Sequence, residues 1–427
     1  MTATDNFQDL QDFAKREITF AREHVNEDTA RLLLSAARYP HIDMPAAVNQ
    51  IEGLRTAKEK WPSLLACEDY LYPPRLNREQ ASSEETATHK AYVADELCGE
   101  ESFLSVADLT GGMGIDSIAF AQRTLFITPL RTQVLTHVDY VERSEALCTL
   151  MEHNRRALGL ENISVHCGDS IEWLTACDRH FDLLFVDPAR RDKGGRKVAA
   201  FEDCEPNILQ HMELLRSCCR WLMVKASPMI DIDLACRQLG DVAEVHVVSV
   251  KGECKEVLFI MGSPCGEPIV KISNLASLSS PAILTTISFH PSDEAAAAAS
   301  YCAAVGRYLY DPHAALRKAG CFRLLSQRLG LPLLAPNSHL YTSDLQVPDF
   351  PGRTFEVLRE VKPSRKAMAE ALPGGKAHVV TRNYPVAAAD LQKQLGLKEG
   401  GDLFVVATTV GTRRAAFLCR LCLPPSA

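Results

Sequence analysis

The chain has 427 residues, of which 46% are hydrophobic and 23% are charged, the composition of an ordinary globular protein. At this length two or three domains are expected. The sequence contains no apolar run of the ~18 residues that span a bilayer, and its start is polar and acidic, so we expect no membrane partner and a cytoplasmic location. The 15 cysteines are odd in number and unpaired in spacing, which favours reduced thiols and no metal site.

Charge is distributed unevenly along the chain. The net charge is −8, which argues against a protein that simply coats nucleic acid. Residues 1–100 hold 11 Lys/Arg and 18 Asp/Glu, whereas residues 351–427 hold 12 Lys/Arg and 6 Asp/Glu. This uneven charge favours the binding of a polyanion at the C-terminal end of the chain. The alternative is an ordinary solvated surface.

Residues 1–80 are expected to form a helical region. Ile51, Leu54, Ala57 and Trp61 recur at spacings of three and four, which places them on one helix face. Prolines between the apolar stretches are expected to separate one helix from the next.

Residues 81–265 alternate strand and helix patterns, which predicts crossover connections and a parallel sheet. The last two strands are joined by a short loop, and such a hairpin would bring an antiparallel strand into the sheet. The expected strands are Phe103–Asp108, Val134–Glu142, Ser164–Cys167, Leu183–Asp187, Trp221–Lys225, Val242–Ser249 and Glu256–Gly262.

The rest of the chain predicts smaller α+β domains, a ferredoxin-like one over residues 266–349 and a final one over residues 350–427. The expected helices are Ala295–Ala299 with Tyr301–Val305, Ala314–Ala319, Phe322–Leu329 and Val386–Leu395. The expected strands are Ile283–Phe289, Phe355–Val361, His378–Thr381, Leu403–Thr409 and Ala415–Cys422.

The segment Ser105–Ser117, SVADLTGGMGIDS, predicts a strand, a glycine-rich turn and a helix start. Glycine lets a ligand approach the backbone, and the helix start presents unpaired N–H groups. A dinucleotide fingerprint would have glycine where this chain has Ser117, so the turn favours S-adenosylmethionine over a nicotinamide cofactor. The candidate ligand-binding residues of this turn are Asp108, Thr110, Gly111, Gly112 and Gly114.

Acidic residues close the next two strands. Glu142 is a candidate for binding both hydroxyls of a ribose, with Asp139 as a rival and an ion pair at the surface as the alternative. Asp169 and Ser170 end the third strand, where Asp169 is a candidate acceptor for an adenine amino group, an N-cap of the next helix, or both.

The fourth strand ends in Asp187-Pro188-Ala189-Arg190, at the carboxyl edge where ligands of such sheets bind. Asp187, Pro188 and Arg190 are the candidate catalytic residues. The basic residues that follow, through Lys197, form a candidate phosphate-binding loop, with a solvated loop as the alternative. Lys225 and the residues after it are candidates for lining the same pocket.

A helix start is expected just upstream of the glycine turn. Ser82 or Ser83 is a candidate N-cap, with Glu85 as the capping-box partner of Ser82. His89 and Lys90 are expected on the helix surface.

The order of these motifs, with an acid before the glycine turn, an acid after the second strand, Gly-Asp and then Asp-Pro, resembles the class I S-adenosylmethionine-dependent methyltransferases. The resemblance implies a Rossmann-like α/β fold whose seven-stranded sheet has an antiparallel last strand. It also implies S-adenosyl-L-methionine as the cofactor, held by the turn, Glu142, Asp169 and Ser170, with Asp187 beginning the acceptor motif.

The domain is similar to the nucleic-acid amino methyltransferases, in which Asp/Asn-Pro-Pro precedes an aromatic residue, whereas this chain has Ala189 and Arg190. The C-terminal part, from Asn383-Tyr384-Pro385 onward, resembles the THUMP-like domain of a bacterial methyltransferase family. These resemblances imply methylation of an RNA base nitrogen, in tRNA or rRNA. The alternatives are a noncatalytic RNA-binding adaptor and a protein or small-molecule methyltransferase.

Overall fold

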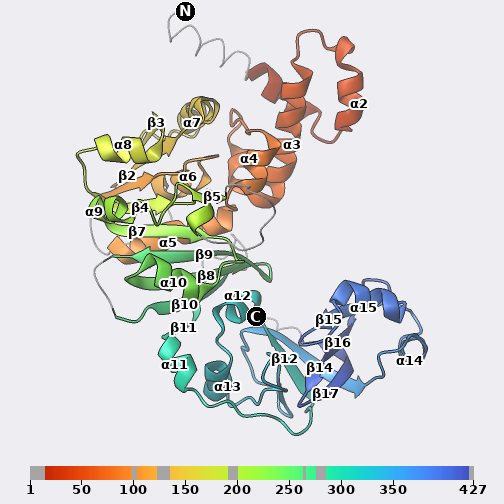
Figure 1. The fold of residues 1–427 in the computed structure, drawn as a ribbon. Coiled ribbons are helices and arrows are strands. Elements are labelled where there is room, and N and C mark those ends of the chain that lie inside the picture. Colours follow the sequence, from red (N-terminus) through yellow and green to blue (C-terminus); the bar gives the residue numbers. More distant parts are fainter. Residues whose placement is uncertain are drawn as a thin grey trace, which may run out of the picture. The chain divides into compact units, whose positions relative to one another are not determined.

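The structure, a computed structural model, describes residues 15–98, 103–122, 135–190, 201–262, 266–275 and 285–422. The chain divides into two units (Figure 1). Unit 1 comprises residues 1–245, 255–266 and 275–283, and unit 2 comprises residues 246–254, 267–274 and 284–427. Among the helices of the described ranges, none has the length and apolar character needed to cross a membrane.

The N-terminal part of unit 1 is helical, as predicted. Its helices after residue 23 are α2 (Thr29–Leu34), α3 (Met44–Lys60), α4 (Arg75–Gln80) and α5 (Glu84–Cys98), with 3₁₀ turns at Ala36–Arg38 and Pro62–Ala66. The Asp43 side chain caps α3 by accepting from the N–H of Ala46. The predicted apolar stripe of α3 is buried, and Trp61 after it donates its indole N–H to Ser82 O at 2.7 Å.

A twisted sheet with helices along it forms the rest of unit 1, although residues 246–254 of its last hairpin are assigned to unit 2 (Figure 1). Its strands are β1 (Phe103–Asp108), β2 (Leu135–Glu142), β3 (Ile163–Cys167), β4 (Phe181–Val186), β7 (Cys219–Ala226), β8 (Val242–Val250) and β9 (Glu253–Met261). Its helices are α6 (Ile115–Ala121), α7 (Glu145–Ala157), α8 (Ser170–Ala176), α9 (Met212–Ser217) and α10 (Ile232–Leu239).

The strand order β8-β9-β7-β4-β1-β2-β3 confirms the predicted Rossmann-like methyltransferase sheet, and two further strands beyond β8 extend it to nine strands. β3, β2, β1, β4 and β7 are parallel, and β9 enters antiparallel to β7. The β8–β9 turn is tighter than the predicted loop, because Lys251 and Gly252 have φ of +50° and +83° and form a two-residue hairpin turn.

Unit 2 contains a six-stranded sheet in the order β13-β12-β14-β17-β16-β15. Its strands are β12 (Tyr308–Pro312), β13 (Tyr341–Ser343), β14 (Gly352–Glu360), β15 (His378–Thr381), β16 (Leu403–Val410) and β17 (Arg413–Leu421). β15 and β16 are parallel, and the other pairs with a described register are antiparallel. β10 (Ile269–Leu275) and β11 (Thr285–Phe289) are also antiparallel to each other, but they belong to the nine-stranded sheet, in which β10 lies next to β8.

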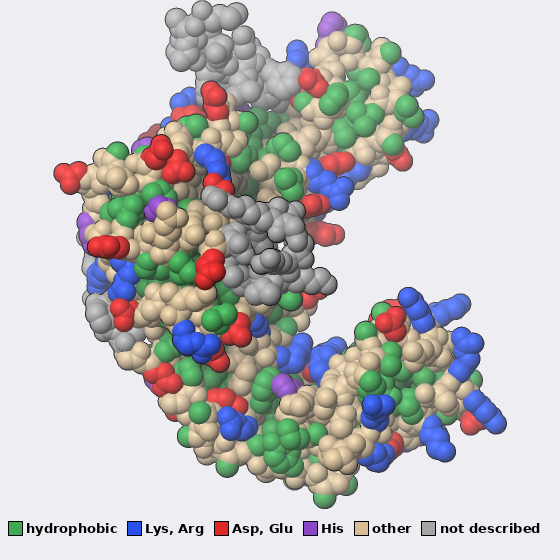
Figure 2. All heavy atoms as spheres, in the orientation of Figure 1, with side chains coloured by type: hydrophobic (Ala, Val, Ile, Leu, Met, Phe, Trp, Pro, Cys, Tyr) green, Lys and Arg blue, Asp and Glu red, His purple; other side chains and the backbone are tan. Residues whose placement is uncertain are grey.

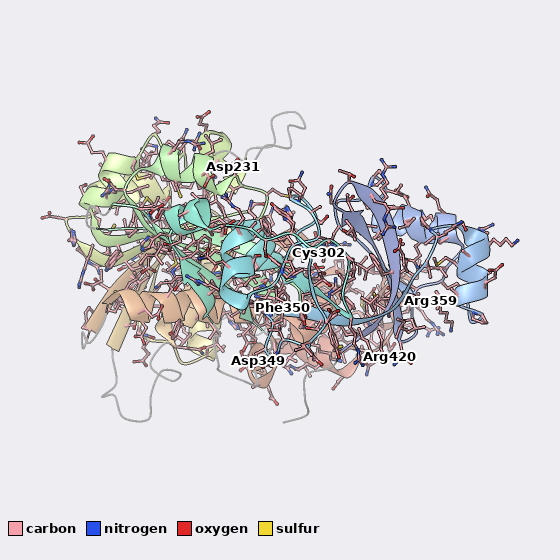
Figure 3. All side chains as sticks on the ribbon, turned by 90° about the horizontal axis from the view of Figure 1, so that it is seen from below. Asp231, Cys302, Asp349, Phe350, Arg359 and Arg420 are labelled. Carbon is pink, nitrogen blue, oxygen red and sulfur yellow. The ribbon has the colours of Figure 1, made fainter. Side chains whose placement is uncertain are left out.

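The helices of unit 2 are α11 (Pro291–Ala296), α12 (Ala314–Ala319), α13 (Arg323–Leu329), α14 (Arg365–Ala371) and α15 (Ala388–Leu395), of which α14 and α15 pack on the six-stranded sheet. Met368 of α14 and Leu391 of α15 share a buried cluster with Val405 and Leu418 of the sheet. Phe355 belongs to a second cluster, together with Phe417. Figure 3 shows Asp349 and Phe350 in the loop that leads into β14.

One predicted helix of unit 2 is wrong. The expected helix is Ala295–Ala299 with Tyr301–Val305, but α11 ends at Ala296. Tyr301 instead makes a parallel bridge with Leu333, and the Cys302 N–H donates to Leu333 O at 3.0 Å. Tertiary strand pairing therefore overrides the helix propensity of the preceding alanines. The sequence pattern also missed β10, β12, β13 and α14.

Candidate active site

The glycine turn after β1 is held in shape by packing and by its backbone conformation. Gly114, the N-cap of α6, has φ of +83°, in the left-handed region that favours glycine. A Cβ on Gly111 would lie 2.3 Å from the ring of Tyr140, so this position has no room for a side chain. The Gly111 N–H donates to Val141 O at 2.9 Å, and the Tyr140 hydroxyl donates to Gly112 O at 2.7 Å. These bonds fix the turn against β2.

Asp108 lies beneath the turn and is 1% exposed. Its Oδ1 accepts from the Thr110 N–H at 3.1 Å, and its Oδ2 accepts from the Ser117 hydroxyl at 2.6 Å. Burial raises the pKa of Asp108 to about 7, although the hydrogen bond from Ser117 acts in the opposite direction. Asp108 is not among the residues that line the adjacent cavity, so its observed contacts order the turn. Ser117, where a dinucleotide fingerprint has glycine, anchors this carboxyl.

Glu142, at the end of β2, lines the cavity. Its Oε2 accepts from the Gly112 N–H and its Oε1 from the Ser144 N–H, both at 2.9 Å. Each carboxylate oxygen has a second acceptor site, so the side chain can still receive two hydroxyl groups. The rival Asp139 is 1% exposed and accepts from His166 at 2.8 Å, so its carboxylate is engaged within the domain.

The end of β3 supplies a second carboxylate. Asp169 is the N-cap of α8, and its Oδ1 accepts from the N–H groups of Ile171 and Glu172 at 2.9 and 3.1 Å. Asp169 and Ser170 both line the cavity. The helix cap therefore points its carboxyl at the site, and the two roles weighed for Asp169 are compatible.

Asp187 follows β4 and lies at the cavity with Pro188 and Ala189. Its N–H donates to Thr110 Oγ1 at 2.7 Å, and its Oδ2 accepts from Lys225 Nζ at 2.5 Å. Burial acts to lower the pKa of Lys225, but nearby carboxylates, Asp187 first among them, outweigh it and raise the pKa. The ammonium stays charged and fixes the Asp187 carboxylate.

The residues after Pro188 form a small ribbon. β5 (Ala189–Arg190) pairs antiparallel with β6 (Cys204–Glu205). The Arg190 side chain and the predicted phosphate-binding loop, residues 191–200, lie outside what the structure describes. Among the described lining residues the aromatic one is Phe201, which packs edge-on against Phe259 with 5.9 Å between ring centroids.

A buried ionic network lies behind Asp187. Lys90 is 0% exposed and contacts both carboxylate oxygens of Glu256 at 2.9 Å and Asp116 Oδ1 at 3.1 Å. The Ser82 hydroxyl donates to Asp116 Oδ2 at 2.7 Å and lies 3.3 Å from the Nζ atoms of Lys90 and Lys225. The network therefore connects α5, the start of α6 and β9 to Lys225 and, through it, to Asp187.

The prediction that His89 and Lys90 lie on the helix surface is wrong. His89 is 1% exposed, because α5 packs its sides against the sheet and α6 rather than presenting one polar face to solvent. Of the two candidate N-caps, Ser83 is the one that accepts from the first turn of α5, so the capping-box pair of Ser82 with Glu85 is wrong. Ser83 accepts from the Thr86 N–H at 3.3 Å, while Ser82 belongs to the ionic network.

A cavity of about 1180 Å³ opens where these strand ends meet. Pro74, Asn77 and Gln80, from the helical N-terminal region, line it as well, a contribution that sequence reasoning missed. Pockets for a single small ligand measure about 300–1,000 Å³, so this one has room for a nucleoside cofactor beside an acceptor. The turn's backbone, the Glu142 carboxylate and the Asp169 carboxyl suit S-adenosylmethionine, which carries a ribose and an adenine amino group.

Comparisons with known proteins agree with this chemistry. Residues 308–351 match a ferredoxin-like domain family, and residues 352–421 match a THUMP domain-like family. Two uncharacterised S-adenosylmethionine-dependent methyltransferases of Mycobacterium tuberculosis, from strains CDC 1551 and H37Rv, are each 26% identical over 278 residues, 64% of this chain and 72% of theirs.

A solved structure matches nearly the whole chain. It comes from Porphyromonas gingivalis W83, is described as a methyltransferase, and is 30% identical with a TM-score of 0.79. The match covers 96% of this chain and 98% of that chain. Since both the sheet and the C-terminal domain are shared at this level, the chain belongs to the class I S-adenosylmethionine-dependent methyltransferases that carry a THUMP-like domain.

Proposed function

We propose that this enzyme transfers the methyl group of S-adenosylmethionine to a nitrogen of an RNA base, in tRNA or rRNA. The observation that carries the proposal is the position of Asp187. Its backbone is tied to the glycine turn through Thr110, and one carboxylate oxygen is tied to Lys225. The carboxyl is 35% exposed and faces the cavity, so an amino group can donate a hydrogen bond to it.

Glu142 would bind the ribose hydroxyls of the cofactor and Asp169 its adenine amino group, with Ser170 beside it. Thr110, Gly111, Gly112 and Gly114 would enclose the methionine end, and Asp108 would hold that turn in place. When bound, S-adenosylmethionine supplies an electrophilic methyl group on a sulfonium with a neutral leaving group.

The protein's part in the reaction is alignment. The acceptor nitrogen would become positively charged as it takes the methyl group from the sulfonium, and it would then release one proton to water. A hydrogen bond from the amine to Asp187 Oδ1 orients the nitrogen lone pair along the methyl–sulfur axis and stabilises that developing charge. Pro188 stiffens the loop, and Arg190 is proposed to contact the substrate.

The RNA assignment rests on the C-terminal domain. THUMP-like similarity over residues 352–421 and the basic charge of this region support an anionic substrate. Figure 2 shows Lys and Arg side chains gathered around α14 and α15. The exposed basic residues there include Lys362, Arg365, Lys366, Lys393 and Lys398. We propose domain boundaries at residues 1–80, 81–265, 266–349 and 350–427.

The test is methylation of total RNA from a strain that lacks the gene, with radiolabelled S-adenosylmethionine. We expect label in RNA with the native enzyme and at least about a hundredfold less with Asp187→Ala, since positioning effects contribute several kcal/mol. Glu172→Ala, on the exposed face of α8, is the matched control and should retain activity.

The same experiment separates the alternatives. Label that appears only in protein would refute the RNA substrate while keeping the methyltransferase. Full activity of Asp187→Ala would refute the role of Asp187. Calorimetric binding of S-adenosylmethionine without transfer to any RNA fraction would favour a noncatalytic adaptor.

A further inference from the structure

An unusual ion cluster lies in unit 2, at the point where the ferredoxin-like and THUMP-like matches meet. Asp311, near the end of β12, is 1% exposed and contacts three arginines. Arg382 binds it with two parallel hydrogen bonds, each 2.9 Å. Arg353 Nη2 lies 2.6 Å from Oδ2, and Arg317 Nη1 lies 3.3 Å from Oδ1.

The cluster draws on both matched domains. Asp311 and Arg317 belong to the ferredoxin-like match, whereas Arg353 and Arg382 belong to the THUMP-like match. Asp311 and Arg353 face each other on β12 and β14, and Arg382 follows β15, 71 residues away in sequence. Neither domain alone would contain the cluster.

Charge within the cluster is unbalanced. Three guanidinium groups face one carboxylate, which leaves two surplus positive charges. The pKa of Asp311 is held below its usual range by the arginines, although burial acts to raise it, so the carboxyl is ionised. Arg382 alone satisfies Asp311 bidentately, so the other two arginines exceed what an internal ion pair requires.

Two histidines near the cluster, His313 and His339, add no compensating negative charge. Burial and Arg317 lower the pKa of His313 to about 4, so it is neutral, and its two ring nitrogens have no hydrogen-bond partner among the described residues. His339 also has a lowered pKa, through burial and then Arg317 and Arg382. The cluster is therefore a positive site bordered by neutral imidazoles.

The arginines are also accessible. The side chains of Arg317, Arg353 and Arg382 are 28%, 43% and 22% exposed. Arg353 uses one of its five N–H donors to bind Asp311, and its guanidinium carbon lies 5.4 Å from the centroid of the Phe355 ring, a second contact that restricts the side chain. Planar guanidinium groups oriented in advance suit the oxygens of a phosphate.

We propose that Arg317, Arg353 and Arg382, oriented by Asp311, form a phosphate-binding site for the RNA substrate, either for its backbone or for a terminal phosphate. The inference rests on the proposed function in one respect, that the substrate is RNA. It adds a defined anchoring point in unit 2, distinct in composition from the methyl-transfer site in unit 1.

The test uses the full chain and 20-nucleotide single-stranded RNA probes that carry either a 5′-phosphate or a 5′-hydroxyl, with binding followed by fluorescence anisotropy. The variant is Arg317→Gln with Arg353→Gln. Arg382 stays in place, so Asp311 keeps a bidentate partner. The control is Arg359→Gln, an exposed residue labelled in Figure 3 on β14, about 20 Å along the strand from Arg353.

We expect the double variant to bind RNA about tenfold more weakly and to lose about 0.7 to 1.4 from the slope of log affinity against log salt. The control should stay within about twofold of the native protein. Equal losses with both probes assign the site to backbone phosphates, and a loss with the phosphorylated probe alone assigns it to the terminal phosphate. The thermal midpoint and S-adenosylmethionine affinity should match the control.

Two results would overturn the inference. If the native protein binds RNA and the double variant binds it as tightly as the control does, the cluster is only an internal ion pair, and the proposed function stands. If the native protein binds S-adenosylmethionine but neither probe nor total RNA, the RNA substrate fails together with this site.

Discussion

Lys225 Nζ lies 2.5 Å from Asp187 Oδ2, so a lysine from β7 holds the carboxylate that ends β4. β4 and β7 are neighbouring parallel strands, so their carboxyl ends, which carry Asp187 and Lys225, lie side by side. The ammonium and Asp187 thus act as one unit, and the carboxylate keeps a single orientation toward the cavity.

We expect Lys225→Met to lower kcat by about tenfold or more, because Asp187 loses its orienting partner. The affinity for S-adenosylmethionine should change by less than about threefold, since the proposed cofactor residues are untouched. Lys225→Arg should restore part of the rate by returning the charge. Steady-state kinetics gives kcat, and calorimetry gives the affinity for S-adenosylmethionine. The control is Lys58→Met, at an exposed lysine of α3. An unchanged kcat would show that Asp187 needs no such partner.

Glu142→Gln should weaken S-adenosylmethionine binding at least about tenfold, which corresponds to about 1.4 kcal/mol. The amide NH₂ group cannot accept a hydrogen bond, so either the Gly112 N–H or the Ser144 N–H loses its acceptor, and the variant disturbs the turn and removes a ribose acceptor. Calorimetry with Glu145→Gln, an exposed residue of α7, as the control provides the comparison. Equal affinities for the two variants would contradict the role of Glu142.

Asp108 makes unit 1 less stable as pH rises. Its pKa is about 7 in the fold, against an ordinary value of 3.8, so the folded chain binds more protons than the unfolded chain between these values. The contribution of Asp108 to the free energy of unfolding is therefore highest below about pH 4 and falls as the pH rises toward 7. Between pH 5 and pH 7 the decrease due to Asp108 is about 2 kcal/mol. Asp108→Asn should remove this dependence.

The measurement is the thermal midpoint of the native protein and of Asp108→Asn between about pH 5 and pH 7. The difference between the two midpoints, native minus variant, should fall as the pH rises. Asn can donate to Ser117 Oγ and accept from the Thr110 N–H, so the variant should fold. Parallel curves for the two proteins would show that the carboxyl is ionised throughout.

Lys90→Met should destabilise the protein by about 3–5 kcal/mol, because it leaves Glu256 buried without its main cation. Replacing both residues, Lys90→Met with Glu256→Leu, should recover much of that loss. Calorimetric unfolding of the single and double variants tests this coupling. A double variant less stable than the single one would show that the network is favourable as a whole.

Sequence reasoning found the sheet because strand periodicity and the residues that end strands are local signals. Glu142, Asp169 and Asp187 each end or directly follow a strand, and parallel topology brings them to one edge. Lys90 was missed because a polar residue in a helix is ordinarily exposed, and only the packing of α5 reveals its burial. The Asp311 cluster could not be predicted, since its members are up to 71 residues apart.

The hydrogen bond from the Asp187 N–H to Thr110 Oγ1 spans 77 residues of sequence and joins the proposed donor-holding turn to the acceptor motif. Under the proposed function, this hydrogen bond would join the two segments that position the reactants, so their separation would not be set independently on each side. A substitution that shifts the turn to admit a bulkier sulfonium would carry the acceptor motif with it. Engineering this enzyme for altered methyl donors would therefore require Thr110 and Asp187 to be varied as a pair.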